Sequence, residues 1–286
     1  MSINIFNILI FFLTGTAVGS FLNVLSSRYS EKTGFKKAFQ GRSYCDHCKK
    51  TLRWFELIPI LSYLFQRGKC MSCKGAIPWQ YAFVELLAGL IAIAVPLKIG
   101  FTFFAFIWVF VLWTLLLMSI VDFRLKIIPN SLVVAILFLG VVSLVYQYIY
   151  PPTSIVAITE GLNLLGHYSL VLTASFNFFV NHVVAVGAGI LLFGGIYLLT
   201  RGRAMGFGDV KLVGALGFLI AWPDILVVLV TPFLVGSLVG LPLILSKKLK
   251  LKSSIPFGPF IAIGVLLTFF FGYDIVNAYF GIFNLI

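Results

Sequence analysis

Residues 101–121 read FTFFAFIWVFVLWTLLLMSIV, and Asp122 follows them directly. This run contains no charged residue, and it is long enough to cross the roughly 30 Å hydrocarbon core of a bilayer as a single helix. A carboxylate beside hydrocarbon is costly, so its presence there needs a reason. The run therefore predicts a transmembrane helix that ends at an acidic residue of functional interest.

Similar apolar runs recur along the 286-residue chain, of which 60% is hydrophobic and only 10% is charged. A soluble domain carries about 25% charged residues. Eight segments have spanning or near-spanning length, namely residues 4–25, 81–97, 101–121, 128–149, 178–200, 209–222, 224–245 and 259–283. The predicted fold is an all-α polytopic membrane protein with about eight transmembrane helices. Residues 151–170 are expected to form the main external loop, and the apolar stretch 169–181 an interfacial helix or an extension of the fifth span.

The basic residues indicate which loops face the cytoplasm. Twenty of the 21 Lys and Arg residues fall in alternate loops, at residues 26–80, 122–127, 201–211 and 246–254. Cytoplasmic loops carry such an excess, so both chain termini should lie outside and Asp122 should lie at the cytoplasmic face. The net charge of +12 is also compatible with nucleic-acid binding, but short basic clusters between apolar runs are typical of membrane loops. We therefore expect the protein to lie in membrane lipid and to bind no nucleic acid.

The segment at residues 26–80, called the cysteine loop below, is the only sizeable soluble element that the sequence predicts. It is too short to build much of a core unaided. The predicted organisation is a first transmembrane helix at residues 1–25, a small cytoplasmic loop domain at 26–80 and a seven-helix membrane domain at 81–286.

All four cysteines lie in the cysteine loop and could staple it. Cys45, Cys48, Cys70 and Cys73 form two Cys-x2-Cys pairs separated by 21 residues. Two such pairs can present four thiolates tetrahedrally to a structural zinc ion, and they leave no open coordination position. Two disulfides are the alternative, but a cytoplasmic loop lies in a reducing compartment, which favours zinc. His47 could replace one ligand, although four cysteines already complete the shell.

Asp122 and a second aspartate, Asp209, are the candidates for catalysis. Gly206 and Gly208 precede Asp209 and let the backbone approach closely. The apolar segment that follows has about 14 residues and at about 1.5 Å per residue is shorter than the hydrocarbon core, so the turn is expected to line a wet cavity within the membrane. The plainer interpretations are that Asp122 caps a helix and balances Arg124, and that Asp209 starts a helix in a cytoplasmic turn.

As a pair, the two aspartates predict hydrolysis of a peptide bond. Two carboxylates at one depth can share a proton, so that one activates water while the other polarises the peptide carbonyl. A transporter that uses paired carboxylates is the alternative from another class. Transporters usually place such groups near the midplane in repeated halves, whereas no repeat is visible here.

Six short motifs follow one another along the chain. They are Gly19–Val24 with Arg28, Phe55–Leu64, Val84–Leu86, Asp122 with Ile128–Asn130, Gly206–Asp209 with Lys211, and Pro256–Pro259. In this order they resemble the motifs of the bacterial type IV prepilin peptidases, also called prepilin leader peptidases/N-methyltransferases. Another intramembrane Gly-x-Gly-Asp protease, of the presenilin or signal-peptide-peptidase type, is the alternative family. The cysteine loop and Pro256–Pro259 favour the prepilin group.

The resemblance implies an eight-helix aspartyl endopeptidase with Asp122 and Asp209 as its catalytic pair. It implies prepilins and pseudopilins as substrates, cut after a basic leader at the cytoplasmic face of the bacterial inner membrane. It further implies N-methylation of the new N-terminal residue by S-adenosylmethionine, with Gly68 and Lys69 linked to methylation. The four cysteines correspond to the zinc site of that family.

Two acidic residues and one turn have competing interpretations. Glu56 and Glu85 are the candidates for an acid that faces the leader, but for Glu85 a capping or pairing role near the membrane surface is the simpler interpretation. The turn Pro256–Pro259 is predicted to start the last helix, with Pro259 at an early helical position. Substrate binding by this turn is the alternative.

Overall fold

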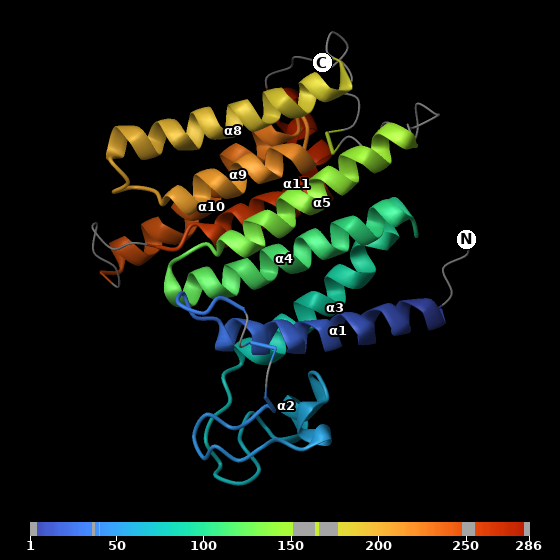
Figure 1. Cartoon of the computed structure of the whole chain (residues 1–286), viewed down its shortest axis with the longest axis vertical. Helices are drawn as coiled ribbons and strands as arrows, with labels where there is room; N and C mark the ends of the chain where they lie inside the picture. Colours follow the sequence, from blue (N-terminus) through green and yellow to red (C-terminus); the bar gives the residue numbers. More distant parts are fainter. Residues whose placement is uncertain are drawn as a thin grey trace. The chain divides into compact units, whose positions relative to one another are not determined.

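The computed structural model describes residues 5–35, 38–39, 41–150, 164–165, 177–247 and 255–282 (Figure 1). Every regular element in these ranges is a helix, and strand-like pairing is limited to isolated bridges such as Tyr44–Thr51 and Lys69–Ala76. The chain divides into two compact units, residues 1–121 and 122–286. These two units are defined by contacts within the chain. The division predicted from the sequence, into residues 1–25, 26–80 and 81–286, separates soluble from membrane parts instead, and it stays a prediction.

The first unit is built on closely packed helices. Its elements are α1 (Ile5–Arg28), the 3-10 turn η1 (Trp54–Leu57), α2 (Leu61–Phe65), α3 (Gln80–Ile99) and most of α4 (Phe103–Leu125). A Cβ atom on Gly15 would lie 2.7 Å from the carbonyl oxygen of Ala88, and one on Gly19 would lie 2.7 Å from the Cα atom of Glu85. Only glycine fits these positions, so α1 and α3 approach each other backbone to backbone, as small residues allow in membranes.

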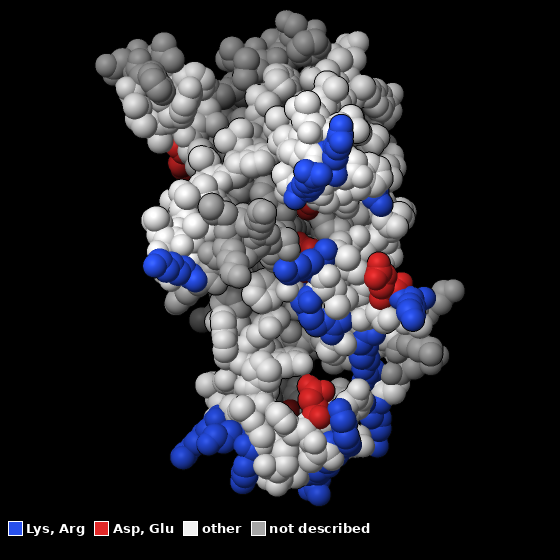
Figure 2. Space-filling model, turned by 90° about the vertical axis from the view of Figure 1, so that its left-hand side faces the viewer, with Lys and Arg blue, Asp and Glu red and all other residues white. Residues whose placement is uncertain are grey.

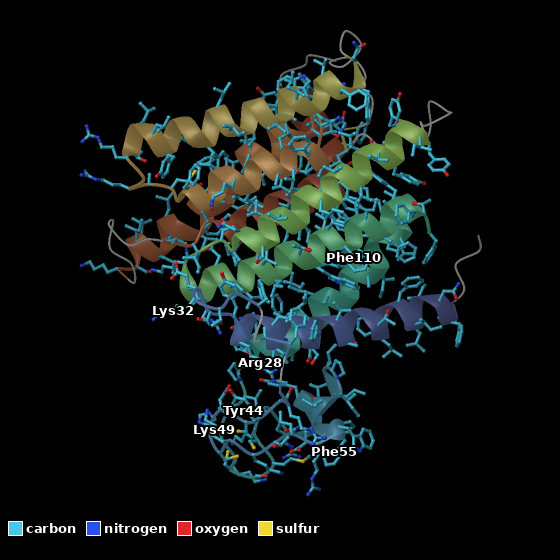
Figure 3. All side chains as sticks on the ribbon, in the orientation of Figure 1. Arg28, Lys32, Tyr44, Lys49, Phe55 and Phe110 are labelled. Carbon is cyan, nitrogen blue, oxygen red and sulfur yellow. The ribbon has the colours of Figure 1, made fainter. Side chains whose placement is uncertain are left out.

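Arg28, the last residue of α1, holds the start of the cysteine loop. Its guanidinium donates hydrogen bonds to the carbonyl oxygens of Ala38 at 3.2 Å, Gly41 at 3.2 Å and Arg42 at 3.0 Å. In Figure 3 the Arg28 label stands at the end of α1 from which the loop departs. The planar guanidinium of Arg28 thus provides hydrogen-bond donors to three carbonyl groups of residues that lie outside any helix.

The surface of the cysteine loop is rich in positive charge. Figure 2 shows Lys and Arg side chains around this loop, at the bottom of the view, with acidic side chains beside a hollow. The Lys49 ammonium lies over the Tyr44 ring, 5.3 Å from its centre (Figure 3). This charge has the sign that cytoplasmic loops carry.

The second unit is organised around a short buried helix. Its elements after the end of α4 are α5 (Asn130–Ile149), α8 (Phe178–Thr200), α9 (Phe207–Leu219), α10 (Ile225–Leu245) and α11 (Gly258–Ile282). α9 packs against both α5 and α8, and its 13 residues are mostly buried. A Cβ atom on Gly217 would lie 2.7 Å from the Cα atom of Val186, so α8 and α9 also meet at a glycine.

Each of the eight predicted apolar segments coincides with a helix, which confirms the all-α polytopic fold. Seven helices are long and apolar enough to cross a membrane, namely α1, α3, α4, α5, α8, α10 and α11. The eighth, α9, spans only about 20 Å at about 1.5 Å per residue. Most of the predicted loop 151–170 and of the stretch 169–181 lies outside the described residues; of the latter, Asn181 lies inside α8.

Candidate functional site

The four cysteines of the cysteine loop come together at one point. Their sulfur atoms all lie within 4.8 Å of one another, and they form the only group of three or more potential metal ligands found among the described residues. All four are free, and the Sγ atoms of Cys45 and Cys73 are 3.8 Å apart, whereas a disulfide requires about 2.05 Å. His47 does not belong to this group. The cluster is therefore suited to a metal ion.

The two Cys-x2-Cys turns share one backbone geometry. The Lys49 N–H donates to the carbonyl oxygen of Cys45 at 2.9 Å, and the Lys74 N–H donates to that of Cys70 at 3.0 Å. Lys49 and Lys74 both have a φ of 58°, a left-handed conformation that few lysines adopt. The repeated turn explains how two pairs separated in sequence aim their sulfur atoms at a common point.

The thiols of the cluster differ in how readily they ionise. The Gly75 N–H lowers the pKa of Cys73, but burial and the neighbouring cysteine sulfurs outweigh it and raise this pKa to about 11, whereas Cys70 shifts in the opposite direction. The backbone N–H groups of Cys73 and Ser72 donate to the sulfur of Cys70, and they lower the pKa of this thiol to about 6, although burial acts in the opposite direction. The thiolate is the form of cysteine that binds metal ions. Cys70 therefore offers a ligand in its binding form at neutral pH.

The second unit brings the two predicted aspartates together. Asp122 lies in the last turn of α4 and is 4% exposed, and Asp209 lies in the first turn of α9 and is 7% exposed. The charge of Asp122 acts on Asp209, so the two carboxyl groups are close enough to interact. Asp209 also caps α9, because its Oδ2 accepts the N–H of Gly206 at 3.1 Å. Asp209 thus lies at the start of a helix, as one interpretation of the sequence expected, and it also lies within reach of the charge of Asp122.

Asp122 is held by a residue that sequence reasoning did not connect with it. The N–H of Gly258 donates to Oδ2 of Asp122 at 2.8 Å, and a Cβ atom on Gly258 would lie only 2.7 Å from that oxygen. Pro256–Pro259 does start α11, as predicted, and the first N–H groups of a helix have no partner within it. Pro259 has no N–H to offer, so Gly258 supplies the donor. The sequence signal that could have indicated this role is the glycine at position 258, between Pro256 and Pro259.

The motifs around the two aspartates also contact each other. The ammonium of Lys211 donates to Oδ1 of Asn130 at 2.7 Å, which joins the N-terminal part of α9 to the start of α5. A Cβ atom on Gly208 would lie 3.0 Å from the Cβ atom of Ile128. The segments 128–130 and 206–211 therefore form one packed structure around the carboxylates.

Gly68 and Lys69 lie in the turn that precedes the second pair of cysteines. Gly68 has a φ of 66°, and a Cβ atom there would lie 3.0 Å from the hydroxyl oxygen of Tyr63. Lys69 pairs with Ala76 in an isolated bridge that closes the second Cys-x2-Cys turn. Both residues thus shape the cysteine loop through their backbone.

Comparisons with known proteins cover both units. Residues 13–99 match the bacterial peptidase A24 N-terminal domain, and residues 108–241 match the type IV leader peptidase family. The prepilin leader peptidase/N-methyltransferase of Stutzerimonas stutzeri is 30% identical over 93% of this chain and 91% of its own. The proteins of the same name from Bacillus subtilis (30% identical, over 94% of this chain and 96% of its own) and Aeromonas hydrophila (29%, over 94% and 92%) are similar to the chain to the same degree. No solved structure matches the chain significantly.

The cysteine cluster lies within the match to the peptidase A24 N-terminal domain, and both aspartates lie within the match to the type IV leader peptidase family. The three relatives are each covered over more than nine tenths of their own length. The chain therefore belongs to the type IV leader peptidase family.

Proposed function

We propose that the chain is a prepilin peptidase that hydrolyses a peptide bond with Asp122 and Asp209 and then N-methylates the new N-terminus. The observation that carries the hydrolytic part is the pair of buried, interacting carboxylates at the ends of α4 and α9. Family membership favours neither a transporter nor a protease of the presenilin type.

The pair acts as one unit with a single shared proton. The ionised carboxylate takes a proton from water as the water oxygen attacks the peptide carbonyl carbon, while the protonated carboxyl donates to the carbonyl oxygen. The C–N bond then breaks, the leaving amine takes up the proton removed from water, and the proton given to the carbonyl oxygen returns to the dyad as the carboxylic acid product forms. Because the two groups share one proton in this scheme, the roles belong to the dyad rather than to either residue.

The proposed substrates are prepilins and pseudopilins in a bacterial inner membrane. The name that the relatives carry supports this substrate class. The basic loops support a cytoplasmic position for both the cysteine loop and the dyad, with both termini outside. In this arrangement the leader stays at the cytoplasmic surface, and the apolar helix of the pilin lies in lipid beside the membrane domain.

The metal of the cysteine cluster is proposed to be zinc. Four thiolates at about 2.3 Å from a tetrahedral zinc ion lie about 3.8 Å from one another. The Sγ atoms of Cys45 and Cys73 are 3.8 Å apart, and the other pairs fall within 4.8 Å. Four thiolates leave no site for water, so this zinc would stabilise the cysteine loop and take no part in hydrolysis.

The proposed methyl donor is S-adenosylmethionine, which supplies an electrophilic methyl group. Gly68 and Lys69 are proposed to support methylation through the turn that they build. Gly68 leaves room for the Tyr63 side chain, and Lys69 fixes the second Cys-x2-Cys turn. The cysteine loop would then carry methylation, and the membrane domain would carry hydrolysis.

The test is mass spectrometry of the N-terminus of a pilin incubated with the purified protein, since it reports both reactions. Asp122→Asn and Asp209→Asn should each abolish cleavage. Asp274→Asn is the matched control, because Asp274 is an exposed aspartate of α11 in the same unit. Cleavage by either dyad variant at the rate of the control would refute the assignment.

A further inference from the structure

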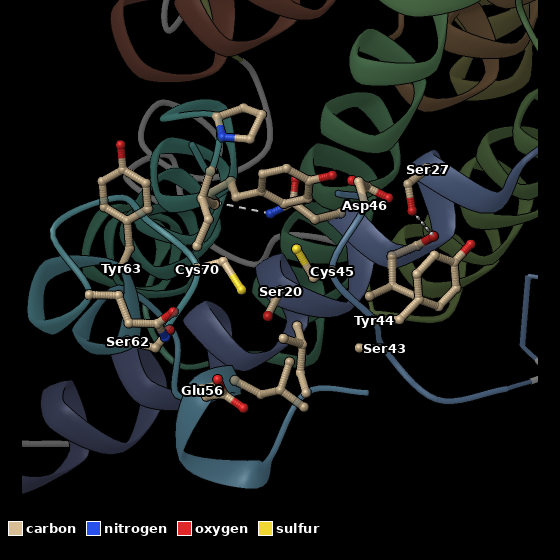
Figure 4. A pocket seen from close by; sticks show the side chains of 18 of the residues that line it. Ser20, Ser27, Ser43, Tyr44, Cys45, Asp46, Glu56, Ser62, Tyr63 and Cys70 are labelled. Atoms are coloured by element: carbon tan, nitrogen blue, oxygen red, sulfur yellow. Dashed lines mark hydrogen bonds between the residues drawn. The ribbon is translucent and has the colours of Figure 1, made fainter. Parts of the chain in front are cut away.

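The first unit contains a cavity of about 360 Å³ beside the cysteine cluster (Figure 4). Its wall combines residues of α1, both Cys-x2-Cys turns, the η1–α2 segment and the first turns of α3. Small-molecule sites usually have volumes of about 300–1,000 Å³. The cavity therefore has room for a ligand of modest size, and the wall is polar enough to orient one.

A buried carboxylate in this wall has an oxygen without a hydrogen bond. The side chain of Glu56 is 1% exposed, and its Oε2 accepts the N–H of Arg53 at 2.8 Å. Its Oε1 is buried and has no hydrogen-bond partner; the Lys50 ammonium stands 3.9 Å away. That ammonium instead donates to the hydroxyl of Ser72 at 2.7 Å. The ion pair of Lys50 with Oε1 at 3.9 Å is too long for a hydrogen bond, so this buried acceptor still has room for a donor from a ligand.

A second buried carboxylate holds a strained turn in the same wall. Oε2 of Glu85 accepts the N–H of Ile60 at 2.7 Å, and the Ser20 side chain hydrogen-bonds the same carboxylate. Ile60 has φ 62° and ψ −52°, and the N–H of Leu61 reaches the carbonyl oxygen of Pro59 at 2.5 Å. This is a γ-turn with positive φ, which is rare and strained, above all for a β-branched residue. Such strain is found where a ligand site must be held in one shape.

Aromatic rings complete the lining. Tyr44, Tyr63 and Tyr81 contribute to the wall together with Glu56 and Glu85. Aromatic faces attract cations and stack on nucleobases. Carboxylates and aromatic rings together favour a ligand that carries positive charge and a planar ring system.

We propose that this cavity binds S-adenosylmethionine, with Oε1 of Glu56 accepting a hydrogen bond from one of its N–H or O–H donors. The sulfonium, ammonium and purine of this ligand match the carboxylates and aromatic rings of the wall, whereas its own carboxylate must lie away from Glu56 and Glu85. Lys50 is 38% exposed on its side chain and can turn to solvent as the cationic ligand enters. The inference rests on the proposed methylation activity and adds a binding site and a recognition residue to it.

The experiment is calorimetric titration of S-adenosylmethionine into the purified, zinc-loaded full chain. Glu56→Gln should raise the Kd about tenfold, because it removes the charge of a buried acceptor. Ser62→Phe should abolish binding, because Ser62 lines the cavity and the larger side chain fills it. Glu31→Gln is the matched control, since Glu31 is exposed and does not line the cavity. Zinc content and monodisperse elution check the fold of each variant. If Glu56→Gln does not fold, the binding measured for Ser62→Phe decides the question.

The outcomes separate this inference from the proposed function. A lower fraction of methylated chains among cleaved pilins, together with weaker binding in both cavity variants, supports the cavity. Wild-type binding and methylation in both variants would overturn the cavity while leaving the proposed methyltransferase intact. A wild-type protein that cleaves pilin but neither binds the donor nor methylates would overturn both the cavity and the methylation. Loss of cleavage in Asp122→Asn bears on the dyad alone.

Discussion

The backbone nitrogen of Gly258 lies 2.8 Å from Oδ2 of Asp122, across 136 positions of the chain, and donates a hydrogen bond to it. The start of α11 thus fixes the orientation of one carboxylate of the dyad. Any residue except proline could supply this N–H, but only glycine leaves free the space that a Cβ atom would occupy 2.7 Å from the oxygen.

Gly258→Ala is expected to lower the cleavage rate about 100-fold, since a displacement of about 1 Å in a catalytic group costs that much. The control is Gly281→Ala in the same helix, where a Cβ atom would meet nothing within 4 Å. Both rates are measured as kcat/KM on a purified prepilin. Equal rates for the two variants would show that Asp122 does not depend on this contact.

The Lys211–Asn130 hydrogen bond is expected to couple α9 to α5 during catalysis. Asn130→Ala and Lys211→Met should lower kcat/KM to a similar degree, and the double variant should be little worse than either. The coupling expected for one partly exposed charged hydrogen bond is about 0.5–1 kcal/mol. Additive effects in the double-mutant cycle would contradict the coupling, and Lys247→Met, which alters an exposed lysine outside this contact, is the control.

One zinc ion per chain is expected in the purified protein, measured by elemental analysis. Removal of the metal by a chelator should make the cysteine loop sensitive to proteases, because structural zinc sites couple binding to folding. Cys70→Ser and Cys73→Ser should lose the metal. Met71→Ala is the control, since Met71 lies between the ligands and is itself no member of the cluster. Metal-free protein with oxidised cysteines would refute the site.

The strained turn at Ile60 gives a prediction about stability. Glu85→Ala should destabilise the protein by about 1–3 kcal/mol, because the N–H of Ile60 loses its acceptor. Ile60→Gly should recover part of this loss, because glycine adopts positive φ without a steric cost. Thermal unfolding of the two single variants and the double variant measures the recovery. If Ile60→Gly worsened the Glu85→Ala variant, the strain would not lie in this turn.

Much of the fold follows from the sequence because lipid leaves the backbone few choices. A chain in hydrocarbon must satisfy its own hydrogen bonds, so each apolar segment, such as 101–121, becomes a helix. The cysteine cluster could be predicted because the spacing of two Cys-x2-Cys pairs restricts what they can bind. The position of Asp209 in the first turn of a short helix also followed from local signals, since Gly206 and Gly208 precede it.

Other features depend on packing between distant segments and left no local signal. The contact of Gly258 with Asp122 requires the ends of α4 and α11 to meet. Glu56 and Glu85 stood out as rare acids, and the simpler interpretation of Glu85 as a capping or pairing group anticipated a local role. Its carboxylate accepts the N–H of Ile60, 25 positions away, so the contact joins two separate segments and its partner could not be named from the sequence. The burial of Glu56 depends on how the cysteine loop closes over it.

The shortness of α9 has a consequence for the supply of reactant. Hydrolysis consumes one water molecule for every bond cut, and hydrocarbon dissolves almost none. With 13 residues, α9 leaves roughly a third of the membrane thickness uncovered. A full-length helix in its place would fill that depth with side chains, whereas we expect the short helix to let water reach its own first turn, which contains Asp209.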